Sequence, residues 1–345
     1  MSGTSHPAAP GGVVPPVATP RPGNAPGPGR RRRRRRISFD RASFFAVALL
    51  LPLTVYVIFV ISPFAQALYF SMTDWSGFTA DMAFVGLDNF ARLLGDDKFM
   101  RAALNSALLA VIVPTVTIVL AIGVATMVTV GGSTTGGVRG VRGAGFYRVI
   151  SFFPYCVPAI VIGLVWAQVY DPSRGLLNGV LTGIGLDGMT DFPWLGDSRT
   201  AMGASMFVII WSFVGFYTVL FVAAIKGVPG EIYEAARLDG AGRFRTAISI
   251  TVPLIRDNVR TAWIYLGIAA IDSFVYMQAM NPGGGPGYST FVISQDLYQT
   301  AFSKGQFGYA TAMGVVLALV TLLFAGAVFL VDRITGGRDD VRGHA

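Results

Sequence analysis

The stretch EIYEAARLDGAGRFRTAISITVPLI, residues 231–255, lies between two apolar runs, 201–225 and 258–280. Each run has the roughly 20 mainly apolar residues that a helix needs to cross the hydrocarbon core of a bilayer. The stretch itself is charged and has a helical pattern. The sequence therefore predicts a membrane protein that places a charged helical connection between two of its spans.

The composition of the whole chain agrees with a protein that crosses the bilayer several times. Of its 345 residues, 53% are hydrophobic and 13% are charged, whereas soluble domains carry roughly a quarter charged residues. Prolines inside several runs are compatible with spanning helices when neighbouring helices or water satisfy the freed carbonyl groups. We predict an all-α membrane protein with six spans, at about 44–70, 104–130, 146–170, 201–225, 258–280 and 308–332.

The first run has a second interpretation, because arginines precede it and Ala65-Gln66-Ala67 resembles a signal-peptide cleavage site. The apolar core of a signal peptide has roughly 7–15 residues. This run is longer, and five more follow it. We therefore expect it to be retained as the first span.

Two tails flank the predicted permeation domain, which covers residues 37–335. Residues 1–36 are rich in Pro, Gly and Arg and lack periodicity, so we expect a disordered cytoplasmic tail. Its arginine run, Arg30 to Arg36, suggests nucleic acid at first sight. A span follows directly, which favours contact with anionic headgroups instead, and no nucleic-acid partner is predicted. Residues 336–345 form a second short cytoplasmic tail.

The distribution of Lys and Arg among the connections predicts the orientation in the membrane. With the N-terminus inside, the inner segments hold 21 of these residues and the outer segments hold 6. Cytoplasmic segments carry such an excess. Both termini and the connection 229–253 are therefore placed in the cytoplasm.

The chain carries no recognisable catalytic or nucleotide site. Its three lysines, Lys98, Lys226 and Lys304, are not followed by Ser or Thr as a phosphate-binding P-loop requires. Its two histidines lie in the tails, and no Gly-x-Ser-x-Gly setting is present. The single cysteine, Cys156, excludes an intrachain disulfide and is predicted to be buried. We predict a protein that is not an enzyme and holds no metal or cofactor.

The connection 229–253 reads as two short helices joined by a bend. Pro229 suits a helix start, and Glu231 and Glu234 suit its positive end. Gly240 permits the left-handed turn that ends this helix, and a second one follows from about 241 to 249. Small alanines would let a partner's backbone approach closely. On the pattern alone, docking into a partner and a solvated structural hairpin with an internal Glu234–Arg237 pair both remain open.

The fifth run contains an ionisable residue near mid-membrane, Asp272. Such residues are costly in a bilayer and mark transport paths. The polar and aromatic side chains near it, with two more in the fourth run, are candidates to line such a path, and the predicted path residues are Asp272, Ser273, Tyr276, Gln278, Trp211 and Tyr217. The alternatives are an interhelix hydrogen bond for Asp272 and aromatic rings that face lipid or a partner. The glycines at 283–287 fall outside by topology, so they predict an outer loop and not a phosphate loop.

The spacing of residues in the connection resembles the EAA signature of ATP-binding-cassette importer permeases. That signature is Glu-Ala-Ala-x3-Gly-x9-Ile-x-Leu-Pro, and the sequence departs from it only in having Val252 for Leu. Further segments are similar to the carbohydrate branch of these permeases. They are FVGLDNFARLL (84–94), FYRVISFFPYCVPAIVIGLVW (146–166), GLLN (175–178), PWLGD (193–197) and NPGGGPGYSTFVISQDLYQTAF (281–302).

The resemblance implies a permease subunit in a bacterial plasma membrane that imports a sugar or related polyol. It would pair with a second, unlike permease, bind two ATPase subunits that hold ATP and Mg, and receive substrate from an extracellular solute-binding protein. It also implies that the connection contacts the ATPase through Glu234, Ala235, Ala236, Arg237, Asp239, Gly240 and Pro253. A proton-coupled secondary transporter is the alternative. It would account for Asp272 but not for the EAA spacing.

Overall fold

The computed structural model describes residues 39–79, 81–129 and 151–336. Within these ranges the regular structure is helical, and the strand-like pairing is a single bridge between Thr73 and Phe84. The all-α class is therefore confirmed for this part of the chain. The predicted tails, 1–36 and 336–345, lie outside the described residues apart from Gly336.

The described chain falls into two units, one up to Val57 and one from Ile58 onward. The first contains helix α1, Phe39–Tyr56. The second begins within a π-helical turn, η1 (Val57–Ile61), at Ile58, and continues with helix α2 (Ser62–Phe70). Pro63 lies in the first turn of α2. Proline lacks an N–H and its ring displaces the carbonyl four residues earlier, which accounts for the widened turn before it.

Four helices of the second unit form its core, namely α4 (Asp97–Thr129), α8 (Ala201–Lys226), α12 (Arg256–Ile271) and α15 (Phe307–Gly336). Helix α4 packs against both α8 and α12, while α15 packs against α12 and α2. Alanine and leucine at the centre of α4 are fully buried, as at Leu109 and Ala121. The apolar pattern therefore builds interhelical contacts as well as lipid-facing surface.

Among the residues that the structure describes, four helices are long and apolar enough to cross a membrane, and α12 with α13 (Phe274–Met280) makes a fifth candidate that is bent by 45°. These five correspond to the predicted runs at 44–70, 104–130, 201–225, 258–280 and 308–332. The run at 146–170 lies partly outside the described residues. Its described part is helical at 151–156 and again in α6 (Ala159–Val169), with Pro158 between.

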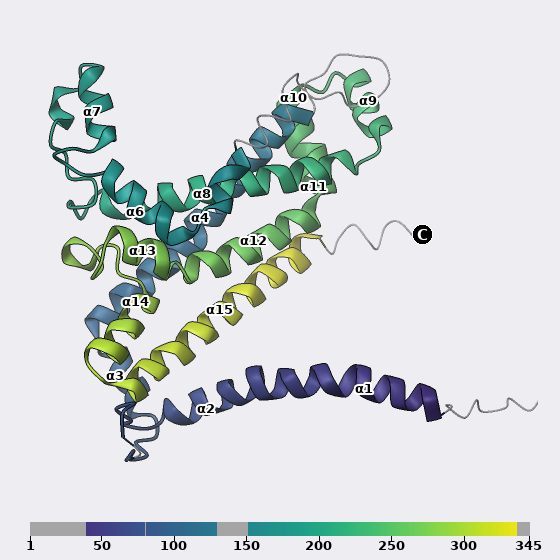
Figure 1. The fold of residues 1–345 in the computed structure, drawn as a ribbon. Coiled ribbons are helices and arrows are strands. Elements are labelled where there is room, and N and C mark those ends of the chain that lie inside the picture. The colour runs from purple at the N-terminus through teal and green to yellow at the C-terminus, as the bar shows by residue number, and fades with distance from the viewer. Residues whose placement is uncertain (1–38, 80, 130–150, 337–345) are drawn as a thin grey trace, which may run out of the picture. The chain divides into compact units, whose positions relative to one another are not determined.

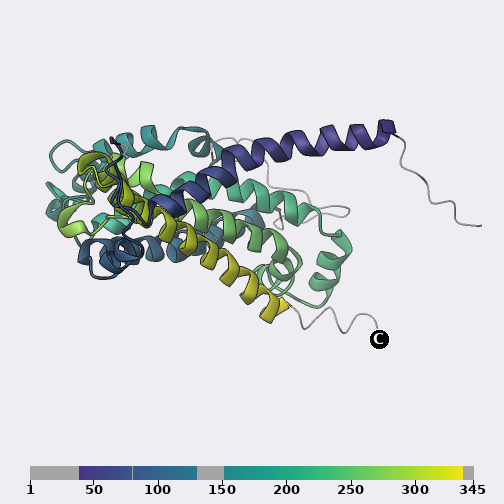
Figure 2. The same ribbon diagram turned by 90° about the horizontal axis from the view of Figure 1, so that it is seen from below.

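The connections gather at opposite ends of this helical core. At one end lie α9 (Gly230–Leu238), α10 (Arg243–Thr246), η3 (Ala247–Thr251) and α11 (Val252–Leu254). At the other lie α3 (Asp88–Leu94), α7 (Leu176–Gly183), η2 (Asp187–Met189), η4 (Pro286–Tyr288), α14 (Ile293–Tyr298) and η5 (Gln299–Ser303). Figure 2 shows the same separation from below. The EAA connection and the glycine-rich loop are thus far apart.

One local prediction is wrong. Cys156 is exposed and not buried. It closes a helical turn just before the break at Pro158, where the chain leaves the helix.

Candidate coupling loop and substrate path

Helix α9 begins after Pro229, with Glu231 in its first turn and Arg237 in its last, as the sequence predicts. It ends at a left-handed Gly240, whose φ is +74°. The amide of Gly240 donates to the carbonyl of Arg237 at 3.0 Å. A side chain is strained at this φ, so glycine suits the position. The predicted bend is confirmed.

The inner face of α9 is anchored to the bundle. Tyr233 is 3% exposed and belongs to the core cluster that contains Ile225 of α8 and Leu266 of α12. Ala236 is also buried, and the hydroxyls of Thr251 and Tyr233 form a hydrogen bond at 3.4 Å. Tyr233 thus shares one buried cluster with residues of α8 and α12, which anchors α9 to the bundle.

The outer face of α9 is open and carries the predicted coupling residues. Glu234, Ala235, Arg237, Asp239 and Gly240 are exposed, whereas Ala236 faces the bundle. The described residues contain no salt bridge between Glu234 and Arg237, which a self-contained hairpin would use. This face is therefore free to contact a partner.

Two large apolar side chains at the tip of the connection were not singled out from the sequence. Leu238 is 90% exposed and Phe244 is 79% exposed. Their signal was present, because each is a large apolar residue between two charged ones: Leu238 lies between Arg237 and Asp239, and Phe244 lies between Arg243 and Arg245. Exposed apolar groups gathered at one tip are typical of a surface that a partner covers.

The second helix of the connection is interrupted, and not continuous over 241–249 as expected. It consists of α10, the π-helical turn η3 and the short α11. Pro253 lies in the first turn of α11. Its missing N–H and its ring widen the preceding turn. The Thr251 hydroxyl donates to the carbonyl of Thr246 at 3.2 Å across that turn.

The predicted path residues of the fifth run lie at a break between helices. Helix α12 ends at Ile271, Asp272 follows with φ −95° and ψ 48°, and α13 begins at Phe274. Asp272 is exposed, whereas Ser273 is 1% exposed and its hydroxyl has no hydrogen-bond partner. A carboxylate is costly against lipid, so this side of the break suits a polar cavity or a partner subunit.

An aromatic cluster joins α13, and sequence reasoning missed most of it. Tyr155 stacks on Phe216 with ring centroids 4.3 Å apart. Phe213 lies 6.0 Å from Tyr155 and 6.4 Å from Tyr276. Only Tyr276 was predicted, because the other contacts join residues that are distant in the sequence. Tyr155 lies between two prolines, which is the one local sign that its segment leaves a regular helix.

The remaining predicted path residues separate into exposed and buried positions. Trp211 is 37% exposed and its ring lies 5.4 Å from Trp166. Tyr217 is 6% exposed and packs in the core beside Phe221. Gln278 accepts a hydrogen bond from Gln295 at 3.1 Å. Asp272, Tyr276 and Trp211 thus retain exposed surface, while Ser273 and Tyr217 lie inside the subunit.

The glycine-rich loop is held tightly against α4. Gly283, Gly284 and Gly285 all have φ between +70° and +92°. Asn105 donates from its amide nitrogen to the carbonyls of Tyr288 at 3.0 Å and Phe291 at 2.8 Å. A buried side-chain amide that satisfies two carbonyls fixes the return of the loop.

Charged residues join the ends of α4, α14 and α15 that lie away from the connection 229–253. Lys98 pairs with Asp296 at 3.4 Å, and Asp296 is 1% exposed. Burial raises the pKa of Asp296, and the charge of Lys98 offsets part of that shift. Burial also opposes ionisation of Asp96. Hydrogen bonds from the amides of Phe99 and Lys98 and from the Tyr309 hydroxyl outweigh it and lower the pKa of Asp96.

Together, the helical bundle and the anchored charged loop define a multi-pass membrane protein with an exposed charged face at one end. Residues 128–335 match the family described as "Binding-protein-dependent transport system inner membrane component", and the chain belongs to this family. It is the transport subunit of an ATP-binding-cassette importer. Its location in the inner membrane follows from the same assignment.

Relatives with printed functions place the chain among sugar permeases. It is 64% identical to the diacetylchitobiose uptake system permease protein NgcF of Streptomyces coelicolor, over 88% of this chain and 86% of that one. It is 30% identical to the multiple sugar-binding transport system permease protein MsmF of Streptococcus mutans, over 79% and 89%. The prediction of a sugar-importer permease is confirmed, and the proton-coupled alternative receives no support.

A solved structure shares the fold. The crystal structure of a bacterial ABC transporter involved in the import of the acidic polysaccharide alginate has a chain that matches with a TM-score of 0.69 and 22% identity. The match covers 85% of this chain and 96% of that one. The individual coupling and path residues remain predictions.

Proposed function

We propose that this chain and a second, unlike permease form the path by which a sugar or polyol enters the cell. In this proposal an extracellular solute-binding protein delivers the substrate. The chain would have six spans, both termini in the cytoplasm and a permease domain over residues 37–335. The observation that carries the proposal is the anchored connection 229–253, whose outer face is open while its inner face packs on α8 and α12.

Two ATPase subunits would dock on the cytoplasmic side, and the connection 229–253 of this chain would bind to one of them. Glu234, Arg237 and Asp239 offer charges to that surface, while Leu238 and Phe244 offer apolar contacts. ATP and Mg would be bound by the ATPase, because this chain has no phosphate-binding lysine motif. Closure of the ATPase pair would move the connection as a rigid body.

The path would run along α8 and the break between α12 and α13. Asp272, Tyr276 and Trp211 contribute polar and aromatic surface, and Tyr155, Phe213 and Phe216 extend it. Ser273, Gln278 and Tyr217 would support these residues from inside. The likeness to the NgcF protein of Streptomyces coelicolor makes an acetamido disaccharide such as diacetylchitobiose the first substrate to test.

The decisive experiment purifies the tagged chain from its native membrane and reconstitutes whatever accompanies it in liposomes. The proposal expects an ATPase, a second permease and a sugar-binding protein in the complex. It also expects uptake of labelled diacetylchitobiose that requires ATP and survives collapse of the proton gradient. Uptake by the chain alone, driven by a proton gradient, would overturn it.

A further inference from the structure

A pocket lies where α6 and α8 approach the connection that contains α7 (Figure 1). Its volume is about 560 Å³, within the roughly 300–1,000 Å³ typical of small-ligand sites. Aromatic side chains and a polar rim form its walls. The lining residues are Trp166, Tyr170, Leu177, Trp194, Arg199, Thr200, Gly203, Ala204 and Phe207.

The aromatic walls are fixed from behind. Tyr170 is 4% exposed, and its hydroxyl donates to the carbonyl of Ala204 at 3.2 Å. The indole N–H of Trp194 donates to the side-chain oxygen of Asn178 at 2.7 Å. The Thr200 hydroxyl donates to the carbonyl of Trp194 at 2.9 Å. The rings are therefore held in place before any ligand arrives, which reduces the ordering cost of binding.

Ring surface remains open inside this fixed frame. Phe207 is 51% exposed and meets Trp166 edge to face, with centroids 5.3 Å apart. Trp166 also lies 5.3 Å from Tyr170, which lies 6.3 Å from Trp194. At the rim, Arg199 is exposed and can direct guanidinium donors at oxygen atoms of a ligand.

The pocket continues toward the proposed path. Trp166 lies 5.4 Å from Trp211, a predicted path residue on α8. The core cluster behind the pocket also includes Tyr276 of α13, and Gly163 of α6 lies against Ala279 of the same helix. A ligand on Trp166 would therefore lie one ring away from the path.

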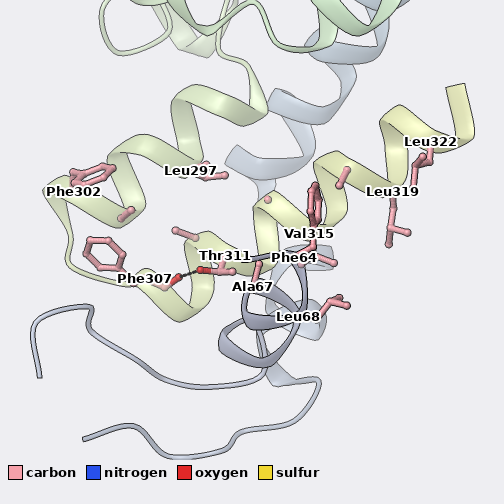
Figure 3. A pocket seen from close by; sticks show the side chains of 14 residues that line it. Phe64, Ala67, Leu68, Leu297, Phe302, Phe307, Thr311, Val315, Leu319 and Leu322 are labelled. Atoms are coloured by element: carbon pink, nitrogen blue, oxygen red, sulfur yellow. Dashed lines mark hydrogen bonds between the residues drawn. The ribbon is translucent and has the colours of Figure 1, made fainter. Parts of the chain in front are cut away.

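A second cavity of similar size has a different lining, and the comparison shows which chemical features set the first pocket apart. It has about 550 Å³ and lies between α2, α14, η5 and α15 (Figure 3). Its walls are almost wholly aliphatic or phenyl, as at Leu319 and Phe302. The Thr311 hydroxyl in its wall is already used by the carbonyl of Phe307 at 2.7 Å. Such a surface suits a hydrocarbon chain, whereas indole faces beside an arginine suit a sugar ring.

We propose that the pocket around Trp166 and Phe207 is an outer subsite that binds a pyranose ring before the sugar reaches Trp211. The C–H face of the sugar would lie on these rings, and Arg199 would donate to a hydroxyl or acetamido oxygen. This inference rests on the proposed function of the chain as a sugar permease. It adds a site outside the path residues predicted from the sequence.

The test compares Phe207→Ala with Phe302→Ala in the complete reconstituted transporter, using diacetylchitobiose as the probe. Phe302 is 64% exposed and lines the aliphatic cavity, so it is a matched control. Loss of one stacked ring should raise the KM for uptake about threefold to tenfold. The maximal uptake rate of Phe207→Ala should stay near that of the wild type. The KM and the maximal rate of Phe302→Ala should both stay near the wild-type values.

A second measurement reports binding itself. Quenching of indole fluorescence by diacetylchitobiose should be reduced in Trp166→Phe, with Trp194 and Trp211 left to report, and unchanged in Trp263→Phe, since Trp263 lies beside Phe324 in another part of the bundle. Wild-type KM in Phe207→Ala with unchanged quenching in Trp166→Phe would overturn the subsite. Dissociation of the two permeases in Phe207→Ala would also overturn it, because the pocket would then be a subunit interface. A lipid that copurifies with the wild type and is lost only in Phe207→Ala would overturn it as well. Absence of wild-type uptake would instead overturn the proposed function.

Discussion

Replacing Leu238 or Phe244 with alanine tests whether the connection 229–253 docks on the ATPase. Leu238 is 90% exposed and Phe244 is 79% exposed, so neither contributes much to the fold of the free chain. Surface substitutions away from special features change stability by roughly 0.5 kcal/mol or less. Alanine also keeps the helix propensity of α9. The permease should therefore accumulate in the membrane at the wild-type level.

The substitutions should instead weaken the binding of the ATPase to the permease. Burying a leucine or phenylalanine side chain contributes roughly 1.5–3 kcal/mol. Loss of about 2 kcal/mol corresponds to roughly a 30-fold weaker complex, since 1.4 kcal/mol is a factor of ten. Each single variant should weaken ATPase binding by that order. Leu238→Met, which keeps the apolar contact, should restore most of it.

The assay uses the permease pair in nanodiscs, titrated with purified ATPase, together with ATP hydrolysis stimulated by loaded binding protein. Leu94→Ala is the control, because Leu94 is 77% exposed but lies on α3 at the opposite end of the bundle. Wild-type affinity and stimulation in both Leu238→Ala and Phe244→Ala would refute the docking face. Equal weakening of ATPase binding by Leu94→Ala would show that the loss of affinity is not specific to the connection 229–253.

Three further substitutions test the loop, the path and the outer charge pair. Gly240→Pro should leave the protein in the membrane and uncouple ATP hydrolysis from uptake, because proline fixes φ near −65° and Gly240 has φ +74°; normal uptake would contradict the role of the bend. Asp272→Asn should reduce uptake of diacetylchitobiose about tenfold, and unchanged uptake and affinity would remove Asp272 from the path. Burial raises the pKa of Asp296 despite Lys98, so the ionised form lowers stability at neutral pH, and this loss disappears as pH falls below the ordinary pKa of an aspartate. Asp296→Asn should therefore raise Tm at pH 7, with a gain that shrinks on acidification; a lower Tm at pH 7 would mean that the ion pair outweighs burial.

The sequence predicts those features that depend on local chemistry. The apolar runs locate the long helices because length and hydropathy are local quantities. The start of α9 at Pro229 and its end at Gly240 follow from backbone preferences of single residues. The break at Asp272 was not predicted, although its carboxylate was chosen as a path residue. A hydrophobic run by itself does not show where its helix bends.

Features that depend on tertiary contacts could not be predicted from the sequence. Ala235 and Ala236 are equivalent by composition, and only packing shows that Ala236 faces inward. The stack of Tyr155 on Phe216 joins residues about 60 positions apart in the chain, so no spacing rule predicts it. Tyr217 looks like a path residue by its type, yet its ring lies in the core. Side-chain direction decides each of these cases.

The connection and the path are joined by the same two helices, which explains how docking at one end can act at the other. Helix α8 has 26 residues and a length of about 39 Å, and it carries Trp211 in its middle. Only three residues separate it from α9. Helix α12 runs from Arg256 to the break at Asp272. Because Tyr233 lies in one buried cluster with residues of both helices, a shift of the connection would be transmitted to α8 and α12.

The 45° break after α12 is the natural place for that motion to be absorbed. Continuous helices transmit displacement along their axes, whereas a break lets the next segment rotate. Helix α13, beyond the break, packs on α6 and carries Tyr276. A push on α9 would therefore change the position of Asp272 and Trp211 relative to Tyr276. This is the change that opening a path to the other side of the membrane requires.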